Sequence, residues 1–204
     1  MNNKDLVSKY ENSEALITGI DKLTEMMAFK NRELYLNDVT REVADAFNTY
    51  IRIWNKLDVE SRLPVDEREP IKIYINSNGG YVQDMWSLVD IMINSKTPIY
   101  TYSTGYAHSC GFLIFIAGTK RFITKHTKMC CHQFSGGATG MYQDIKEKVE
   151  DLDRMWRDFE DYICTQTKIT KARLQEIREK KLDWYIYSEE SIGLGVATDF
   201  VDKF

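Results

Sequence analysis

Residues 105–117 read GYAHSCGFLIFIA and carry a serine, Ser109, between a β-rich segment and an apolar run. The run Phe112–Ala117 is apolar on every side, which predicts a buried helix in the middle of the fold. A serine where a strand passes into a helix has its hydroxyl in the field of the helix N-terminus. Because that field favours a nucleophile, Ser109 is the first candidate for a catalytic residue.

Strands and helices alternate on both sides of this stretch. Short apolar runs predict strands at residues 32–36, 71–75, 99–103, 121–124, 128–132 and 183–187. Apolar residues at helical spacing predict helices at residues 39–57, 81–94, 141–165 and 170–181, and a last helical turn begins at residue 188. Strands joined by helices in this way predict an α/β fold with strand-to-helix crossovers.

Two of the helices carry clear apolar stripes. In the helix at 39–57 the stripe is predicted to pack in the core, and it consists of Val43, Phe47, Tyr50, Ile51 and Trp54. The helix at 141–165 is long and charged, and its narrow stripe consists of Ile145, Val149, Leu152, Met155, Phe159 and Ile163. Such a helix usually packs against another chain or projects from its domain.

Two segments lie outside the alternation. Residues 1–30 are polar, and apolar positions from 15 to 27 predict a short amphipathic helix after a tail. Residues 58–70 are charged and contain two of the three prolines, which predicts a surface loop.

Composition bounds the class of protein. The 204 residues are 43% hydrophobic, enough for the core of one domain of ordinary size. A formal charge of −4 with mixed signs lacks the basic face that nucleic acids need, so no DNA or RNA partner is expected. No uncharged apolar run is long enough to span a membrane and no signal peptide is recognisable, which predicts a cytoplasmic protein. The four cysteines form no CxxC pair, so free thiols are expected rather than disulfides or a zinc site.

The search for a general base is short because the chain has three histidines. His132 ends an apolar strand and precedes a glycine-rich loop, whereas His126 lies in a polar hairpin and is expected to be solvated. His108 directly precedes Ser109, so the two side chains would point in different directions. A lone serine and histidine most often have structural roles. Gly79-Gly80 changes that balance, because these glycines would let backbone N–H groups form an oxyanion hole.

Five segments in register resemble the proteolytic subunit of the ATP-dependent Clp protease. They are YINSNGG at 74–80, GYAHSCG at 105–111, AG at 117–118, MCCHQF at 129–134 and GGATG at 136–140. The resemblance runs from about Arg32 to the C-terminus. It implies the ClpP/crotonase-like α/β fold, with stacked βαβ units and a projecting handle helix. Residues 1–204 would form one domain, with an N-terminal tail and helix at 1–30, a head at 31–134 and 182–204, and a handle region at 135–181.

The same resemblance implies a serine endopeptidase. Ser109 matches the nucleophile of the family, His132 its general base and Asp183 the acid of its triad. The backbone N–H groups of Gly80 and Cys110 match its oxyanion hole. This assignment agrees with the chemistry of a Ser-His-Asp triad, in which the histidine takes the proton of the serine and the acid fixes its tautomer.

Substrate and partners also follow from the resemblance. An unfolded polypeptide would lie between two segments by strand addition, which tolerates many sequences. The residues expected to bind it, beside Gly80, are Tyr81, Val82, Phe134, Ser135, Gly136 and Gly137. The helix at 141–165 would join two heptameric rings of this chain, and an AAA+ unfoldase would deliver the substrate. No cofactor and no metal are expected.

The chain departs from the pattern of the family at four positions. Asn78 and Phe134 stand where prolines are usual, Leu182 replaces an arginine that pairs with an acid matched by Asp144, and Asn94 stands where an aromatic residue is common. These departures keep a second hypothesis open, a weakly active or regulatory ring subunit. The thiol of Cys110 is a rival nucleophile, and a crotonase-type acyl-CoA enzyme is a third alternative.

Overall fold

The structure is a computed structural model that describes residues 22–203. Its sheet contains β1 (Glu33–Leu36), β2 (Ile71–Ser77), β3 (Ile99–His108), β4 (Lys120–Ile123) and β7 (Asp199–Phe200) in the order β1-β2-β3-β4-β7. Two further strands, β5 (Lys128–Cys131) and β6 (Trp184–Tyr187), extend it from β3 through β5 to β6. All the pairings are parallel except that of β5 with β6.

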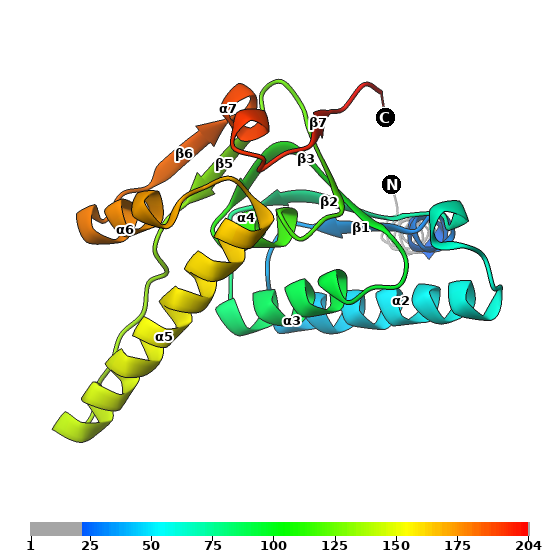
Figure 1. The fold of residues 1–204 in the computed structure, drawn as a ribbon. Coiled ribbons are helices and arrows are strands. Elements are labelled where there is room, and N and C mark those ends of the chain that lie inside the picture. Colours follow the sequence, from blue (N-terminus) through cyan, green and yellow to red (C-terminus); the bar gives the residue numbers. More distant parts are fainter. Residues whose placement is uncertain (1–21, 204) are drawn as a thin grey trace, which may run out of the picture.

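Helices connect the parallel strands, as predicted. They are α2 (Arg41–Glu60), α3 (Val82–Ile93), α4 (Cys110–Phe115), α5 (Tyr142–Gln166), α6 (Lys171–Lys180) and α7 (Ser188–Gly193). Figure 1 shows α2 and α3 side by side on one face of the β1-β2-β3 part of the sheet, where α3 also contacts α4. Every residue of α4 is buried, which confirms the expectation of a helix enclosed by the fold. The chain is thus an α/β protein, as predicted.

Strand β3 is longer than its apolar run indicates, and it changes partners along its length. Its first half pairs with β4, and residues 106–108 pair with β5. The sequence Ser-Thr-Gly at 103–105 interrupts the apolar pattern, which is why the second half was not predicted as strand. This second half brings the chain to Ser109.

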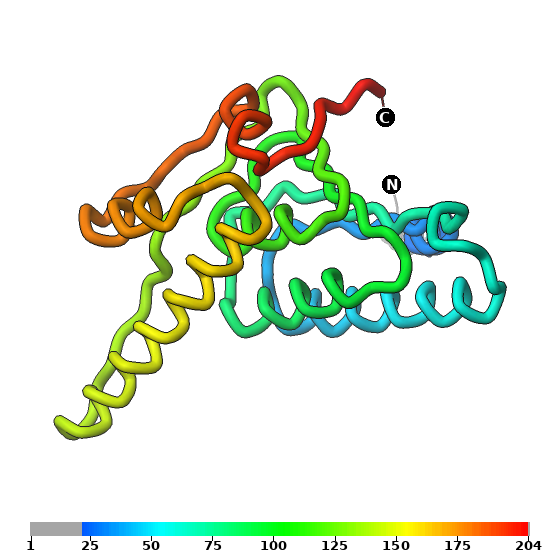
Figure 2. The backbone as a smooth tube through the Cα atoms, viewed as in Figure 1, coloured from blue at the N-terminus to red at the C-terminus, as the bar shows by residue number. Residues whose placement is uncertain are grey.

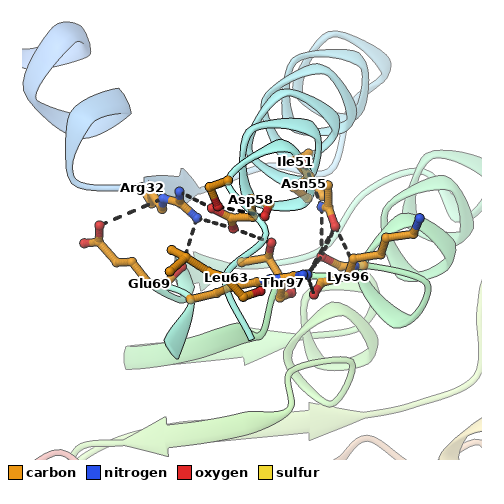
Figure 3. Close-up of polar contacts among 11 residues, drawn as sticks. Arg32, Ile51, Asn55, Asp58, Leu63, Glu69, Lys96 and Thr97 are labelled. Atoms are coloured by element: carbon orange, nitrogen blue, oxygen red, sulfur yellow. Dashed lines mark hydrogen bonds and ion pairs between the residues drawn. The ribbon is translucent and has the colours of Figure 1, made fainter. Parts of the chain in front are cut away.

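Asp58 is not part of a surface loop, as its charged surroundings predicted, but lies in α2 with 3% of its surface exposed. The Arg32 guanidinium donates to both of its carboxylate oxygens, at 2.6 and 2.7 Å, and the Thr97 hydroxyl donates at 2.6 Å (Figure 3). The Arg32 hydrogen bonds hold the pKa of Asp58 below its ordinary value. A carboxylate can be buried here because its charge is paired and its oxygens are hydrogen-bonded. The contacts tie the start of β1 to the end of α2 and to the turn before β3.

The apolar stripes predicted for two helices are buried only in part. In α2, Phe47, Ile51 and Trp54 are buried, whereas Tyr50 is 39% exposed and contacts Phe29 and Trp54 at the edge of the core. Residues 22–30 are helical, and the other residues of the predicted N-terminal helix lie outside the described part of the chain.

Helix α5 projects from the body of the molecule, as expected. Its start, residues 142–150, is exposed, and its later turns bury Trp156, Phe159, Glu160 and Ile163. Figure 2 shows the segment after β5 running outward beside α5, which then returns to the body. Among residues 22–203, no helix combines the length and the apolar character needed to cross a membrane.

Candidate active site

Ser109 occupies a strained turn between β3 and α4. Its φ of 54° and ψ of −124° are uncommon for a residue with a side chain. The Ser109 N–H donates to the Cys130 carbonyl at 3.0 Å, and the Ser109 carbonyl accepts from the Phe112 N–H at 3.0 Å, so both sides of the turn are held. Although Ser109 stands at the N-cap of α4, its side chain makes no capping hydrogen bond. The turn therefore presents the hydroxyl instead of using it to end the helix.

The register of β5 and β6 brings His132 and Asp183 together. Cys131 and Trp184 are the last pair of this antiparallel ladder, so His132 and Asp183 each lie one residue beyond it. Directly opposed residues on such strands have Cβ atoms about 4.5–5.5 Å apart. On the other side of β5, His108 is paired with Cys130. The three triad candidates therefore follow or precede three neighbouring strands at the same edge of the sheet.

The electrostatics agree with this arrangement. Burial, followed by the charge of Asp183, raises the pKa of the Cys130 thiol to about 11. Cys130 lies two residues before His132, so the Asp183 charge acts close to the end of β5. Ser109 and His132 also line one pocket. In the described part of the chain, no hydrogen bond joins His132 to either Ser109 or Asp183. Such bonds are often long without substrate and tighten when it binds.

Gly79 and Gly80 bring the backbone against the serine turn. A Cβ on Gly79, whose φ is 110°, would lie 2.8 Å from the Ser109 Cβ and 3.1 Å from the Cys110 nitrogen. A Cβ on Gly80, whose φ is 153°, would lie 2.1 Å from the Val39 oxygen. Within residues 22–203, neither the Gly80 N–H nor the Cys110 N–H donates to a backbone carbonyl, and backbone groups of both residues hydrogen-bond with the Cys110 thiol. Two backbone N–H groups without a carbonyl partner thus lie near Ser109, as an oxyanion hole requires.

The Cys110 thiol is buried and hydrogen-bonded to the backbone of the glycine turn. Its sulfur donates to the Gly80 carbonyl at 3.3 Å and the residue is 3% exposed. Burial raises the pKa of this thiol, so its thiolate is disfavoured. These observations oppose the interpretation of Cys110 as the nucleophile, because the thiolate is the reactive form.

The expected peptide-binding residues flank the serine on two sides. Tyr81 is exposed and extended, and its N–H donates to the Val39 carbonyl at 2.9 Å. Val82 is the first residue of α3, so it contributes a side chain to the pocket rather than a strand edge. On the other side Phe134 is half-buried, and Ser135, Gly136 and Gly137 are exposed in an irregular segment.

The pocket beside Ser109 and His132 is apolar. It is a hollow of about 390 Å³, counting space open to solvent. Helix α4 contributes Cys110, Phe112 and Leu113, and the rest of the wall comes from Val82, Cys131, Phe134, Trp156, Phe159 and Ile163. Sequence reasoning did not single out Trp156, although Trp156, Phe159 and Ile163 recur at helical spacing.

His108 lies beside the triad candidates without touching Ser109 through its ring. The ring contacts those of Tyr106 and Tyr185, with centroids 5.1 and 6.0 Å away, and its Nε2 is buried without a hydrogen-bond partner in the described chain. Burial, and then the charges of Lys128 and His132, lower the pKa of His108. A neutral imidazole is therefore favoured at this position.

The cysteines and acidic residues show no sign of a metal centre. Cys110, Cys130, Cys131 and Cys164 are free. In residues 22–203, no three histidine, cysteine or acidic side chains gather where they could hold a metal ion.

Comparison with known proteins places this geometry in a family context. The sequence model of the Clp protease family matches residues 28–203. The chain is 29% identical over 140 residues to the ATP-dependent Clp protease proteolytic subunit 2 of Synechococcus sp. (strain CC9605), covering 68% of this chain and 70% of that protein. It is 31% identical over 140 residues to subunit 1 of Synechococcus sp. (strain CC9902), with the same coverage. It is 26% identical over 185 residues to subunit 3 of Rhizobium johnstonii, covering 89% of this chain and 90% of that protein.

Proposed function

The chain belongs to the Clp protease family, and on this basis we propose that it is a serine endopeptidase, the proteolytic subunit of a self-compartmentalising protease that cleaves unfolded polypeptides. The observation that carries the proposal is the turn at Ser109, which holds an uncapped serine in a strained conformation. Strained backbone of this kind clusters at functional sites.

The proposed reaction is acyl transfer. The Ser109 Oγ attacks the peptide carbonyl carbon while His132 takes its proton, and His132 then returns the proton to the leaving amine. Asp183 orients the imidazole and stabilises its cation. The developing oxyanion accepts from the N–H groups of Gly80 and Cys110, each of which is worth on the order of 10²–10³ in kcat. Water then releases the acyl group by the same steps.

The exposed start of α5 supports the proposed assembly into paired heptameric rings. It carries Met141 and Tyr142, which are 77% and 82% exposed, next to the half-exposed Ile145 and Val149. A projecting helix with apolar side chains of this kind is stabilised when a second copy of the chain covers it. We assign these rings to the cytoplasm.

An aromatic face supports a partnership with an unfoldase. Tyr35, Tyr74, Tyr102 and Phe122 stack across β1 to β4, with successive ring centroids 5.2, 5.0 and 4.9 Å apart. Relatives of the chain are named ATP-dependent, and an aromatic surface with polar hydroxyls is typical of a docking site.

The alternative is a ring subunit that acts through assembly and cleaves little. The absence of hydrogen bonds from His132 to Ser109 and Asp183 within the described chain favours it. Labelling with a fluorophosphonate probe separates the two. The wild-type protein should be labelled at one site, and Ser109→Ala should abolish both labelling and hydrolysis of fluorogenic peptides. Ser87→Ala, on the exposed side of α3, should retain both. An assembled wild-type protein that the probe leaves unlabelled would establish the regulatory subunit instead.

A further inference from the structure

We propose that Phe134 and Trp156 limit the peptidase to substrates with a small apolar side chain, of about alanine size, at the residue whose carbonyl is attacked. The inference deepens the proposed function and rests on it. The side chain of that residue lies beside the nucleophile and base, and the apolar pocket is lined by both Ser109 and His132.

The pocket is nearly filled by rings. Its enclosed part has room for only one or two water molecules. An alanine methyl group occupies about the volume of one water, near 30 Å³. A leucine or phenylalanine side chain would have to displace atoms of the wall, and overpacking of this kind is unfavourable. Polar side chains are excluded because rings and aliphatic groups would leave them without hydrogen bonds.

Phe134 and Trp156 form the partition that makes the pocket small. Their ring centroids are 5.9 Å apart, and the Phe134 ring also lies 5.3 Å from that of Phe159. A second hollow of about 580 Å³, counting space open to solvent, is lined by residues of the segment after β5, by residues of α5 and by Arg178 of α6. Phe134 and Trp156 line both hollows. Removing one of these rings would therefore join them.

The Trp156 side of this partition is held in place by contacts with polar side chains. The Trp156 indole N–H donates to a Glu160 carboxylate oxygen at 2.8 Å. The Arg178 guanidinium lies over the indole, 5.7 Å from its centroid. The Trp156 ring therefore cannot swing aside freely to admit a larger side chain. Phe134 lies in an irregular segment and its ring carries no hydrogen-bonding group. A substitution at Phe134 should therefore open the wall with the smallest loss of stability.

The test uses peptidyl diphenyl phosphonates that differ only in the side chain next to phosphorus, with alanine, leucine and phenylalanine analogues. The Ser109 oxygen displaces phenoxide from phosphorus, and the rate constant is followed by the intact mass of the full-length protein. Wild type should react with the alanine analogue about tenfold or more faster than with the others. Phe134→Ala should reduce that ratio about tenfold or more, and Phe134→Leu should reduce it by less. Phe200→Ala, which removes an exposed ring from β7, should keep the wild-type ratio.

The outcomes separate this proposal from the function it rests on. If wild type reacts faster with the leucine or phenylalanine analogue, the size limit is wrong while the nucleophile stands. An unchanged ratio in both Phe134→Ala and Phe134→Leu, with each variant folded by circular dichroism, also overturns it. If no analogue modifies Ser109, the proposed peptidase itself fails and the size limit with it.

Discussion

Replacing Gly79 with alanine should cripple hydrolysis while the protein stays folded. The added Cβ would lie 2.8 Å from the Ser109 Cβ, whereas carbon atoms in contact prefer about 3.5–4.0 Å. The serine turn or the glycine turn must therefore move by about 0.7–1.2 Å. The same Cβ would approach the Cys110 nitrogen to 3.1 Å, so the shift disturbs the nucleophile and an oxyanion donor together.

The expected loss follows from that displacement. A misplacement of about 1 Å costs on the order of 10²-fold in rate. The φ of 110° at Gly79 adds strain to an alanine there, worth about 1–3 kcal/mol of stability. We therefore expect kcat/KM to fall on the order of 10²-fold for fluorogenic peptides, with a cooperative unfolding transition that remains visible in urea.

Gly193→Ala is the matched control. Nothing lies within 4 Å of a Cβ added at Gly193, and its φ is ordinary, so activity should equal that of wild type. Stability should be unchanged or slightly higher, because alanine favours a helix. If Gly79→Ala retains kcat/KM within about threefold of wild type, the close approach of the glycine turn to Ser109 is not part of catalysis, and the reasoning fails.

Three further perturbations test other parts of the structure. Asp58→Ala leaves the Arg32 charge without its buried partner and should cost about 3 kcal/mol in urea unfolding at pH 7, with a strong coupling to Arg32→Ala in a double-mutant cycle. If the stability losses of the two single variants simply add in the double variant, the ion pair is contradicted. Burial lowers the pKa of His108 in the folded protein, so the stability it contributes is present above its unfolded pKa near 6.5 and is lost as the pH falls. As the pH is lowered from 7.5 to 5, the free energy of unfolding of His108→Phe should therefore rise relative to that of wild type. A difference in unfolding free energy that does not change with pH would exclude the effect. Asp183→Asn should lower kcat on the order of 10³–10⁴-fold with little change in KM, and a loss below about tenfold would remove Asp183 from the triad.

The sequence predicts the strands and helices well where apolar periodicity is strong. The buried run after Ser109 becomes α4, and the apolar alternation at 71–75 becomes β2. Asp58 was misjudged because its charge and the prolines near it are typical of a loop. The Arg32 guanidinium that pairs with it is 26 residues away, and local sequence carries no sign of that contact.

The candidate site can likewise be predicted from the sequence only in part. Motifs locate Ser109, His132 and Asp183, but only the register of β5 with β6 shows that His132 and Asp183, 51 positions apart in sequence, both flank the last pair of one ladder. The sequence does not indicate Trp156 as a pocket residue, because it is one aromatic residue among many charged residues of the same helix. Its importance depends on the Phe134 ring, which reaches it only when the segment after β5 runs back along α5.

The Ser109 turn is less stable than the same segment could be. A serine at an N-cap usually accepts a hydrogen bond from the first helical turn, worth about 1 kcal/mol, and Ser109 does not. Its φ of 54° adds a strain of about 1–3 kcal/mol. The conformation persists because the surroundings leave no room to relax. The Ser109 N–H is held by Cys130, Gly79 lies against its side chain, and every residue of α4 is buried. A fold that forgoes this stability at one serine, beside two backbone N–H groups without a carbonyl partner, supports the proposed role of the Ser109 hydroxyl as a nucleophile.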